Sequence, residues 1–521
     1  MKYLSINAVS GIIEHRIYVR RSTQTILRNR RKTKRAQAVK QKLAGNYMMF
    51  TAYQFFILLV PLISMPYVAR VLGPESNGTY SFLESTVMYF TLAASCGSAV
   101  YGQREIAYLD NKADRTRVFT EIFLIRLIMT LISFAIFFGV FGLQERYGSL
   151  YLLFSFNILT VIFDISWFYQ GMEEFTRVVV QCTVIRLVAL VCIFLFVKSP
   201  EDLPIYILCQ SVPNLVGAFS LWPGVHRKMT KISFKNLQLK KHMLPILLLF
   251  LPQISSEIFG MLDKTMIEVL THQAELNAYY QYSQKIVKII LIGITSLGIV
   301  MIPSMSAAFA RKAYDEIRQR MEDIFRFAFF LGCPLMFGLL AVADVFIPLF
   351  FGDKYLPAIE LTCFLAPTVI LVSCSNVLGV QYLLPSRQQG VFTLSLVLGI
   401  IVNIVGNALL VPHFSALGTV YATVASEFVV TLTQSIAVRK QLPLGKMYRS
   451  GAVYLISGAV MAAITYLVGI LIPGRALSFA IRFVIAVTTY SLAMFLAHDP
   501  MFARLLAIIG KIKNKVFRRG R

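Results

Sequence analysis

Apolar blocks about 20 residues long recur along almost the whole of this chain, and this recurrence limits its fold more than any other feature. An α-helix rises 1.5 Å per residue, so about 20 apolar residues cross the roughly 30 Å hydrocarbon core of a bilayer. Charged residues make up only 15% of the chain, whereas soluble domains carry about 25%. Too little charge remains to cover a water-facing surface, so we predict an all-α polytopic membrane protein.

The apolar blocks predict about fourteen membrane-spanning helices. These spans cover residues 47–70, 79–101, 118–142, 149–170, 177–197, 204–224, 243–270, 279–302, 324–350, 357–384, 390–411, 416–436, 449–472 and 477–497. The seventh and tenth are longer than a bilayer requires, so we expect them to tilt or break.

Basic residues favour alternate connections between the predicted spans. The even-numbered connections contain Arg104, Lys112, Arg115, Arg117, Arg177, Arg227, Lys228, Lys231, Lys235, Lys240, Lys241, Arg311, Lys312, Arg318, Arg320, Arg387, Arg439, Lys440, Lys446 and Arg449. The odd-numbered connections contain only Arg70, Arg146, Lys198, Lys354 and Arg475. The positive-inside rule therefore places the even-numbered connections and both basic termini in the cytoplasm. This orientation accounts for the net charge of +25, and we predict no nucleic-acid partner.

The connections between the predicted spans lack the motifs that several classes of function require. They hold no P-loop, HExxH or DxD motif, and no predicted outer connection is longer than about ten residues. The seven cysteines lie in or beside apolar spans, and none forms a CxxC pair. Cysteines in such positions usually act as small buried hydrophobic residues and not as disulfide or metal-binding partners. We therefore expect no enzyme activity, no cofactor and no metal site.

Charged side chains inside the predicted spans are the candidate functional residues, because each costs at least about 2.5–3.5 kcal/mol near the bilayer centre. In span 279–302, Lys285 and Lys288 lie one turn apart on a polar face, where they repel each other. An anion would relieve that repulsion, and so would an ion pair with the preceding span. That span carries Glu257, Asp263 and Lys264. Either acid could exchange an ion, and Glu257 could equally be a fixed counter-ion to Lys288.

The first half of the chain has a second group of charges at similar depth, formed by Arg126, Asp164 and Arg186. One acid among two guanidinium groups leaves a positive surplus, which favours an anion site. Arg126 could instead extend toward the interface. A pair of asparagines one turn apart, Asn403 and Asn407, is expected to join its helix to a neighbour.

A weak internal repeat relates the two halves. Residues 72–82, LGPESNGTYSF, align with residues 270–283, LTHQAELNAYYQYS, when Tyr80 is placed on Tyr280. Six spans separate the copies, so both run in the same direction. This arrangement is a parallel repeat with its axis along the membrane normal, as in several transporters.

Four stretches, in this order, resemble the Wzx-type flippases of the multidrug/oligosaccharidyl-lipid/polysaccharide exporter superfamily. They are PYVARVLGPESNGTYSF (66–82), WFYQGMEEFTR (167–177), MLDKTMI with YYQYSQKIVKI (261–267 and 279–289) and NIVGNALLVPHFSALGTVYATVASEF (403–428). The chain departs from the family pattern in two places. Residues 272–278 lack the usual Gly-Pro, and Lys264 stands where many members carry arginine, so a point charge replaces a bidentate group.

The resemblance implies two six-helix lobes around a central cavity, followed by two further helices. The expected units are a basic cytoplasmic extension (1–46), an N-lobe (47–224), a basic cytoplasmic linker (225–242), a C-lobe (243–436), two C-terminal helices (437–497) and a basic cytoplasmic tail (498–521). It also implies location in the bacterial cytoplasmic membrane and a lipid-linked oligosaccharide as substrate, carried on undecaprenyl pyrophosphate. Membrane lipids and polysaccharide-assembly proteins such as a polymerase are the expected partners.

On this interpretation, we expect the bases to bind the substrate and the acids to couple transport to an ion gradient. The substrate-binding candidates are Arg126, Arg186, Lys264, Lys285 and Lys288, and the ion-coupling candidates are Asp164, Glu257 and Asp263. The main alternative is an ion-coupled exporter of organic cations from the same superfamily, which should favour acids over paired bases in its cavity. A membrane-embedded polysaccharide-processing enzyme and a scaffolding protein are further alternatives.

Overall fold

A computed structural model describes residues 59–231, 237–507 and 510. Four predicted segments lie wholly or partly outside the described residues. They are the N-terminal extension (1–46), the start of the first span (47–58), five residues of the linker (232–236) and residues 508–509 and 511–521 of the tail. In the described part of the chain, the regular structure is helical and contains no strand.

The first described element is a helical segment at residues 59–95. It is followed by α2 (Ser98–Ala107), α3 (Lys112–Phe137), α4 (Gly148–Phe163), α5 (Ser166–Gly171), α6 (Phe175–Phe196), α7 (Leu203–Ser220), α8 (Leu239–Thr271), α9 (Ala274–Ala310), α10 (Tyr314–Phe351), α11 (Ala358–Leu365), α12 (Thr368–Leu378), α13 (Gln389–Phe414), α14 (Ala416–Val438), α15 (Leu444–Ile470) and α16 (Arg475–Leu496).

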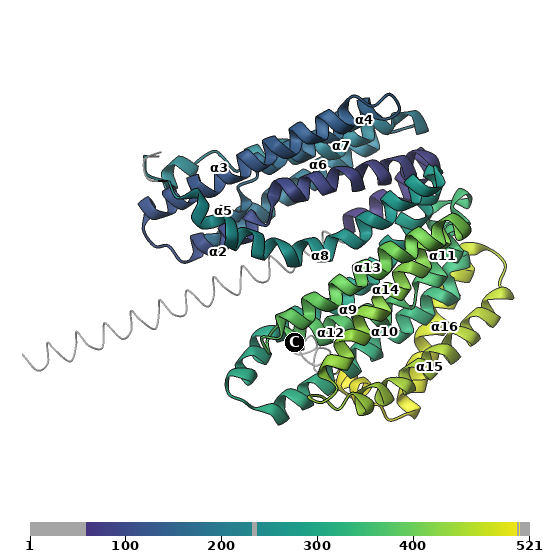
Figure 1. The fold of residues 1–521 in the computed structure, drawn as a ribbon. Helices are drawn as coiled ribbons and strands as arrows, with labels where there is room; N and C mark the ends of the chain where they lie inside the picture. The colour runs from purple at the N-terminus through teal and green to yellow at the C-terminus, as the bar shows by residue number, and fades with distance from the viewer. Residues whose placement is uncertain (1–58, 232–236, 508–509, 511–521) are drawn as a thin grey trace, which may run out of the picture.

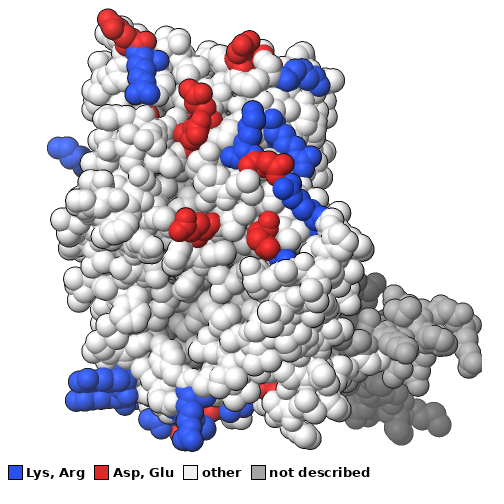
Figure 2. Space-filling model, turned by 90° about the vertical axis from the view of Figure 1, so that its right-hand side faces the viewer, with Lys and Arg blue, Asp and Glu red and all other residues white. Residues whose placement is uncertain are grey.

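These helices confirm the predicted class of fold, an all-α polytopic membrane protein. In the described residues, ten helical stretches are long and apolar enough to cross a membrane. The remaining predicted spans correspond to segment 59–95 and to α8 and α9, and the last two carry five of the candidate charged residues: Glu257, Asp263, Lys264, Lys285 and Lys288. Exposed leucine, isoleucine and valine side chains occur along most of the helices, and Figure 2 shows a face with wide areas that carry no charged side chain.

Segment 59–95 contains a sharp reversal, although its residues are helical throughout. Asn77 donates from Nδ2 to the carbonyl oxygens of Val68 (3.1 Å) and Gly73 (2.7 Å). Nine residues of straight helix would separate Asn77 from Val68 by about 13.5 Å. The chain therefore turns back at Gly73, whose φ of +72° is a conformation that favours glycine. The two antiparallel arms correspond to the first two predicted spans.

Two of the predicted spans are interrupted. The tenth breaks between α11 and α12 at Pro367, which has no N–H to donate. The fourth breaks between α4 and α5 at Asp164, where the backbone becomes extended. The seventh, in contrast, forms the continuous helix α8.

The helices form two lobes (Figure 1). Segment 59–95 and α2–α7 form the N-lobe, and α9–α14 form the C-lobe. Helix α8 lies between the lobes and contacts α2 and α3 as well as α9, α13 and α14. The last two helices, α15 and α16, pack against α10 and against each other.

The bundle has two chemically different ends. We call the end with the short turns at Gly73, 143–147, 197–202, 272–273, 352–357 and 471–474 the turn end. We call the opposite end, which carries the connections rich in lysine and arginine, the basic end.

Candidate functional site

The central cavity, of about 410 Å³, lies where the N-lobe meets α9. Segment 59–95, α6 and α7 supply its N-lobe walls. Its basic residues are Arg186 of α6 and Lys285 and Lys288 of α9. The polar and aromatic side chains around it are Ser64, Asn77, Tyr80, Tyr206, Gln210, Asn214, Gln281 and Tyr282. The cavity therefore combines positive charge with amide and hydroxyl groups that can donate hydrogen bonds.

The three bases of the central cavity have no acidic partner. Among the described residues, none of Arg186, Lys285 and Lys288 has a carboxylate oxygen within 4.0 Å. The Lys285 ammonium lies 5.6 Å from the centre of the Tyr282 ring. A Cβ on Gly260 of α8 would lie 3.4 Å from the Lys288 Nζ, so that ammonium packs against a glycine surface. Unpaired bases in a hollow leave a positive potential that an anion can neutralise.

An acidic cavity of about 470 Å³ adjoins the central cavity. Glu84 and Asp164 supply its carboxylates. The residues that line both cavities are Tyr80, Ile185, Gln210 and Asn214. The Asp164 carboxylate accepts a hydrogen bond from the backbone N–H of Ser166 at 2.9 Å, across the break between α4 and α5. Bases therefore line one cavity and acids line its neighbour, with shared walls between them.

Lys264 of α8 forms an ion pair with Glu84 of the N-lobe. Its Nζ lies 3.3 Å from Oε2 of Glu84, and the same oxygen accepts from Nε2 of Gln281 at 3.3 Å. Tyr80 donates to the other carboxylate oxygen at 3.4 Å. Lys264 does not line the central cavity as Lys285 and Lys288 do. Its charge is already partnered in this conformation.

Arg126 lies apart from both cavities, buried within the N-lobe. Its Nε and Nη2 donate to the carbonyl oxygen of Val161 at 3.2 and 2.8 Å. In an unbroken helix that carbonyl would accept from residue 165, but α4 ends at Phe163. The guanidinium therefore replaces a missing helix hydrogen bond at the Asp164 break. The structure does not bring Arg126 together with Arg186.

Asp263 is fully buried at a junction of four helices. Oδ1 accepts from Nδ2 of Asn403 at 2.9 Å and from Nδ2 of Asn407 at 3.0 Å. Oδ2 accepts from Thr423 at 3.0 Å and from the Tyr280 hydroxyl. The amide oxygens of both asparagines are buried without a hydrogen-bond partner. The predicted asparagine pair therefore joins α13 to α8 through this carboxylate.

Glu257 differs from Asp263 in its surroundings. Its side chain is exposed, and it forms no ion pair within 4.0 Å in the described part of the chain. It is thus not paired with Lys288 in this conformation.

Comparison with known proteins decides the family. Residues 43–309, about half of the chain, match the family described as "Polysaccharide biosynthesis protein". The chain belongs to the polysaccharide biosynthesis protein family. This result confirms the resemblance drawn from the sequence motifs.

Other members and neighbours are consistent with that family. A protein of Shigella dysenteriae named "Putative O-antigen transporter" is 22% identical over 393 residues, which cover 73% of this chain and 96% of the relative. A relative of the same name from Escherichia coli (strain K12) is 22% identical over 414 residues, which cover 77% of this chain and 97% of the relative.

Solved structures show the same fold. The structure titled "Lipid II flippase MurJ, inward closed conformation" has a TM-score of 0.70 at 14% identity, and covers 87% of this chain and 100% of that one. An inward-facing multidrug resistance MATE family transporter of the MOP superfamily has a TM-score of 0.57 at 13% identity, and covers 76% of this chain and 96% of that one.

In this member of the polysaccharide biosynthesis protein family, the sequence did not predict two buried clusters of polar side chains. Glu121 of α3 accepts from Nε2 of His242 at 2.8 Å, and Nδ1 of His242 lies 2.7 Å from the Tyr101 hydroxyl. Arg482 of α16 lies 2.6 Å from Asp344 of α10 and anchors the last helix. An arginine inside the last apolar span was a signal for the second group. The first joins residues far apart in sequence, so no local pattern marks it.

Proposed function

We propose that this protein is a flippase that moves an oligosaccharide linked to undecaprenyl pyrophosphate from the inner to the outer leaflet of the bacterial cytoplasmic membrane. The observation that carries the proposal is the central cavity, in which Arg186, Lys285 and Lys288 have no acidic partner within 4.0 Å among the residues that the structure describes. Membership of the polysaccharide biosynthesis protein family and the names of the relatives support the same class of substrate. A lipid-linked pyrophosphate supplies the missing negative charge.

The chemistry of the cavity fits both parts of the substrate head group. A pyrophosphate or a sugar cannot enter hydrocarbon without losing its hydrogen bonds to water, at a cost of several kcal/mol for each unpaired group. The bases can hold the pyrophosphate, and the amides of Gln210, Asn214 and Gln281 can pair with sugar hydroxyls. The two lobes would rock and expose this hollow to each side in turn. Glu84 and Asp164 would limit how tightly the anion is held.

The direction of transport rests on the orientation of the bundle. We propose that the basic end and both chain termini face the cytoplasm, by the positive-inside rule. An anion that moves outward from a negative interior gains about 2.3 kcal/mol per charge per 100 mV. Single cysteines at exposed Gln144 (turn end) and Lys240 (basic end), in a cysteine-free background, test this orientation. An impermeant thiol reagent should label only the first in intact cells, and labelling of the second would reverse it.

Asp263 is the residue we propose to couple transport to an ion gradient. Carboxylate and amide oxygens are ligands that hard cations prefer. Asn403 and Asn407 face Asp263 with their Nδ2 groups in this conformation, and rotation of the two amides would turn their unpartnered oxygens toward a bound cation. The exposed Glu257 and the cavity residue Asp164 remain secondary candidates. We also propose the predicted division into an N-lobe (47–224), a C-lobe (243–436, here including α8) and two C-terminal helices (437–497), and an association with a polymerase.

The decisive experiment removes charge from the central cavity. Lys285→Gln together with Lys288→Gln keeps polarity and approximate size, and a matched control carries Lys198→Gln and Lys354→Gln at the exposed turn end. Both variants should reach the membrane at wild-type levels. The cavity variant should lose surface polysaccharide and accumulate the lipid-linked precursor, whereas the control should not. Full export by the cavity variant would refute the anion site, and export of cationic dyes by the wild type, with polysaccharide unaffected by gene deletion, would favour a multidrug exporter.

A further inference from the structure

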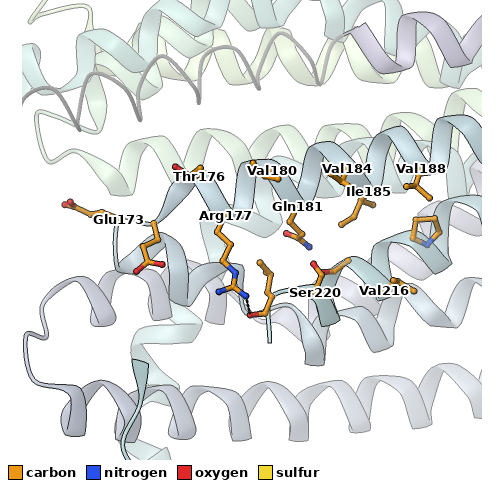
Figure 3. Close-up of a pocket in the computed structure, with 14 residues that line it drawn as sticks. Glu173, Thr176, Arg177, Val180, Gln181, Val184, Ile185, Val188, Val216 and Ser220 are labelled. Atoms are coloured by element: carbon orange, nitrogen blue, oxygen red, sulfur yellow. Dashed lines mark hydrogen bonds between the residues drawn. The ribbon is translucent and has the colours of Figure 1, made fainter. Parts of the chain in front are cut away.

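A groove of about 710 Å³ lies between α6 and α7, and it is larger than either the central or the acidic cavity (Figure 3). Val180, Val184 and Val188 follow one another every four residues along the α6 wall, and Val216 lies on the α7 wall. These four side chains are 45–61% exposed. Exposed valines in two membrane-spanning helices contact hydrocarbon, so the groove opens toward the lipid.

Polar residues occur at one end of the groove. Glu173, Thr176 and Arg177 line it where α6 begins, at the basic end of the bundle. Arg177 is fixed there, because it donates to the carbonyl oxygens of Leu221 (3.2 Å) and Pro223 and its guanidinium carbon lies 4.5 Å from the centre of the Tyr169 ring. From Arg177 to Val188 the helix rises about 16 Å, which is roughly the thickness of one leaflet's hydrocarbon.

Only a thin wall separates the groove from the two polar cavities. The Ile185 side chain lines the groove, the central cavity and the acidic cavity, and Gln181 lines the groove and the acidic cavity. A Cβ on Gly217 of α7 would lie 1.8 Å from Cδ1 of Ile185, so the wall closes by packing Ile185 onto a glycine. The next residue, Arg186, faces the central cavity. Lipid-facing and basic surfaces therefore meet across one side chain.

We propose that this groove binds the polyisoprenoid chain of the lipid-linked substrate while its pyrophosphate lies at Arg186 in the central cavity. The inference rests on the proposed function and specifies where the lipid part is held. Separation of Ile185 from Gly217, as α6 moves away from α7, would open the wall so that the head group enters from the leaflet at the basic end. An ordinary phospholipid also has an apolar chain that could lie in the groove. Its small head group, however, would not fill a large cavity lined by bases and amides, whereas a pyrophosphate-linked oligosaccharide would.

Photocrosslinking tests the occupant directly. A benzophenone amino acid replaces Val184 in the groove or, as a control, Val405 of α13, which is 50% exposed and lines none of the three cavities described above. The purified full-length protein is placed in vesicles of phosphatidylethanolamine and phosphatidylglycerol that contain radiolabelled undecaprenyl pyrophosphate. Position 184 should capture the radiolabel at least several-fold more than position 405. Equal capture at both positions, or capture of phospholipid alone at 184, would overturn the proposal.

A second measurement separates this inference from the proposed function. Val184→Trp fills the groove, and Val405→Trp adds the same bulk to a lipid-facing surface elsewhere. Both are compared at equal membrane levels and with unchanged thermal unfolding midpoints. We expect several-fold less surface polysaccharide from the first variant only. If the wild type restores polysaccharide to a deletion strain and Val184→Trp restores it equally, the groove has no such role and the flippase assignment stands. If the wild type restores none, the flippase assignment itself fails.

Discussion

Gly78 of the N-lobe and Ala274 of the C-lobe are packed so closely that a Cβ on Gly78 would lie 1.6 Å from the Ala274 carbonyl oxygen. Other contacts between the lobes surround this one. Asn77 donates to the Tyr355 hydroxyl at 3.1 Å and accepts from the Tyr282 hydroxyl at 3.1 Å. These contacts lie at the turn end of the bundle, so the lobes are closed there.

The close approach predicts that Gly78→Val opens the turn end. The added side chain would collide with backbone, which cannot move aside as a flexible side chain can, so the lobes must separate. Ser81→Cys, one turn further along on the same buried face, reports the opening with a nearly isosteric thiol. In a cysteine-free background, Gly78→Val should raise the rate at which an impermeant reagent labels this thiol in intact cells several-fold.

Gly445→Ala is the matched control for that experiment. A Cβ at position 445 meets no atom within 4 Å, so alanine fits there without displacing a neighbour. Labelling of the Ser81→Cys thiol should stay at the wild-type rate in this control. An unchanged rate in Gly78→Val as well would show that the turn end does not close as the structure places it.

Arg126→Gln should destabilise the protein without a specific effect on transport by the folded fraction. The substitution removes two charge-assisted hydrogen bonds to the Val161 carbonyl, each of a kind that contributes about 1.5–3 kcal/mol. Arg186→Gln is the comparison, since Arg186 lines the cavity and should affect export more than stability. Thermal unfolding in detergent and export per folded molecule separate the two effects. Equal unfolding midpoints for the two variants would contradict the capping role of Arg126.

The contrast between Arg126 and Arg186 shows how far the sequence could predict the site. Span counting placed both arginines at similar depth and suggested a common role. Depth follows from the rise of 1.5 Å per residue, but the direction of a side chain around the helix axis depends on which neighbours the helix meets. Only the packing of α3 against α4 shows that Arg126 points to a broken helix, whereas Arg186 points to a hollow.

The spans themselves were predictable, because a bilayer requires length and apolarity that can be read directly from a sequence. The ion pair between Glu84 and Lys264 was not, because it joins residues 180 positions apart, one in the N-lobe and one on α8. Lys285 and Lys288 were identified because two bases one turn apart are conspicuous in an apolar span. Within the described part of the chain they have no acidic partner while Lys264 is paired with Glu84, and this difference depends on tertiary structure alone.

His242→Ala should destabilise the contact between α8 and the N-lobe. It leaves the buried carboxylate of Glu121 with the Gln238 N–H (2.8 Å) and without its histidine partner. An unpaired buried polar group costs about 1–3 kcal/mol. The thermal unfolding midpoint in detergent should fall, whereas His413→Ala, at an exposed position of α13, should leave it unchanged. A midpoint equal to that of the wild type would mean that water replaces the imidazole.

Asp263→Asn should make transport insensitive to an imposed ion gradient, because it removes the one negative charge on which Tyr280, Asn403, Asn407 and Thr423 converge. The amide keeps the size of the side chain and one acceptor oxygen, so the buried junction can still form. It binds a cation or a proton far less well than a carboxylate does, so coupling to the gradient should be lost. Export of surface polysaccharide is measured while the sodium and proton gradients are varied separately, with Glu257→Gln at an exposed position of the same helix as the comparison. We expect a several-fold loss of gradient dependence in Asp263→Asn alone. If both variants respond to the gradients as the wild type does, Asp263 serves only to hold α8, α9, α13 and α14 together.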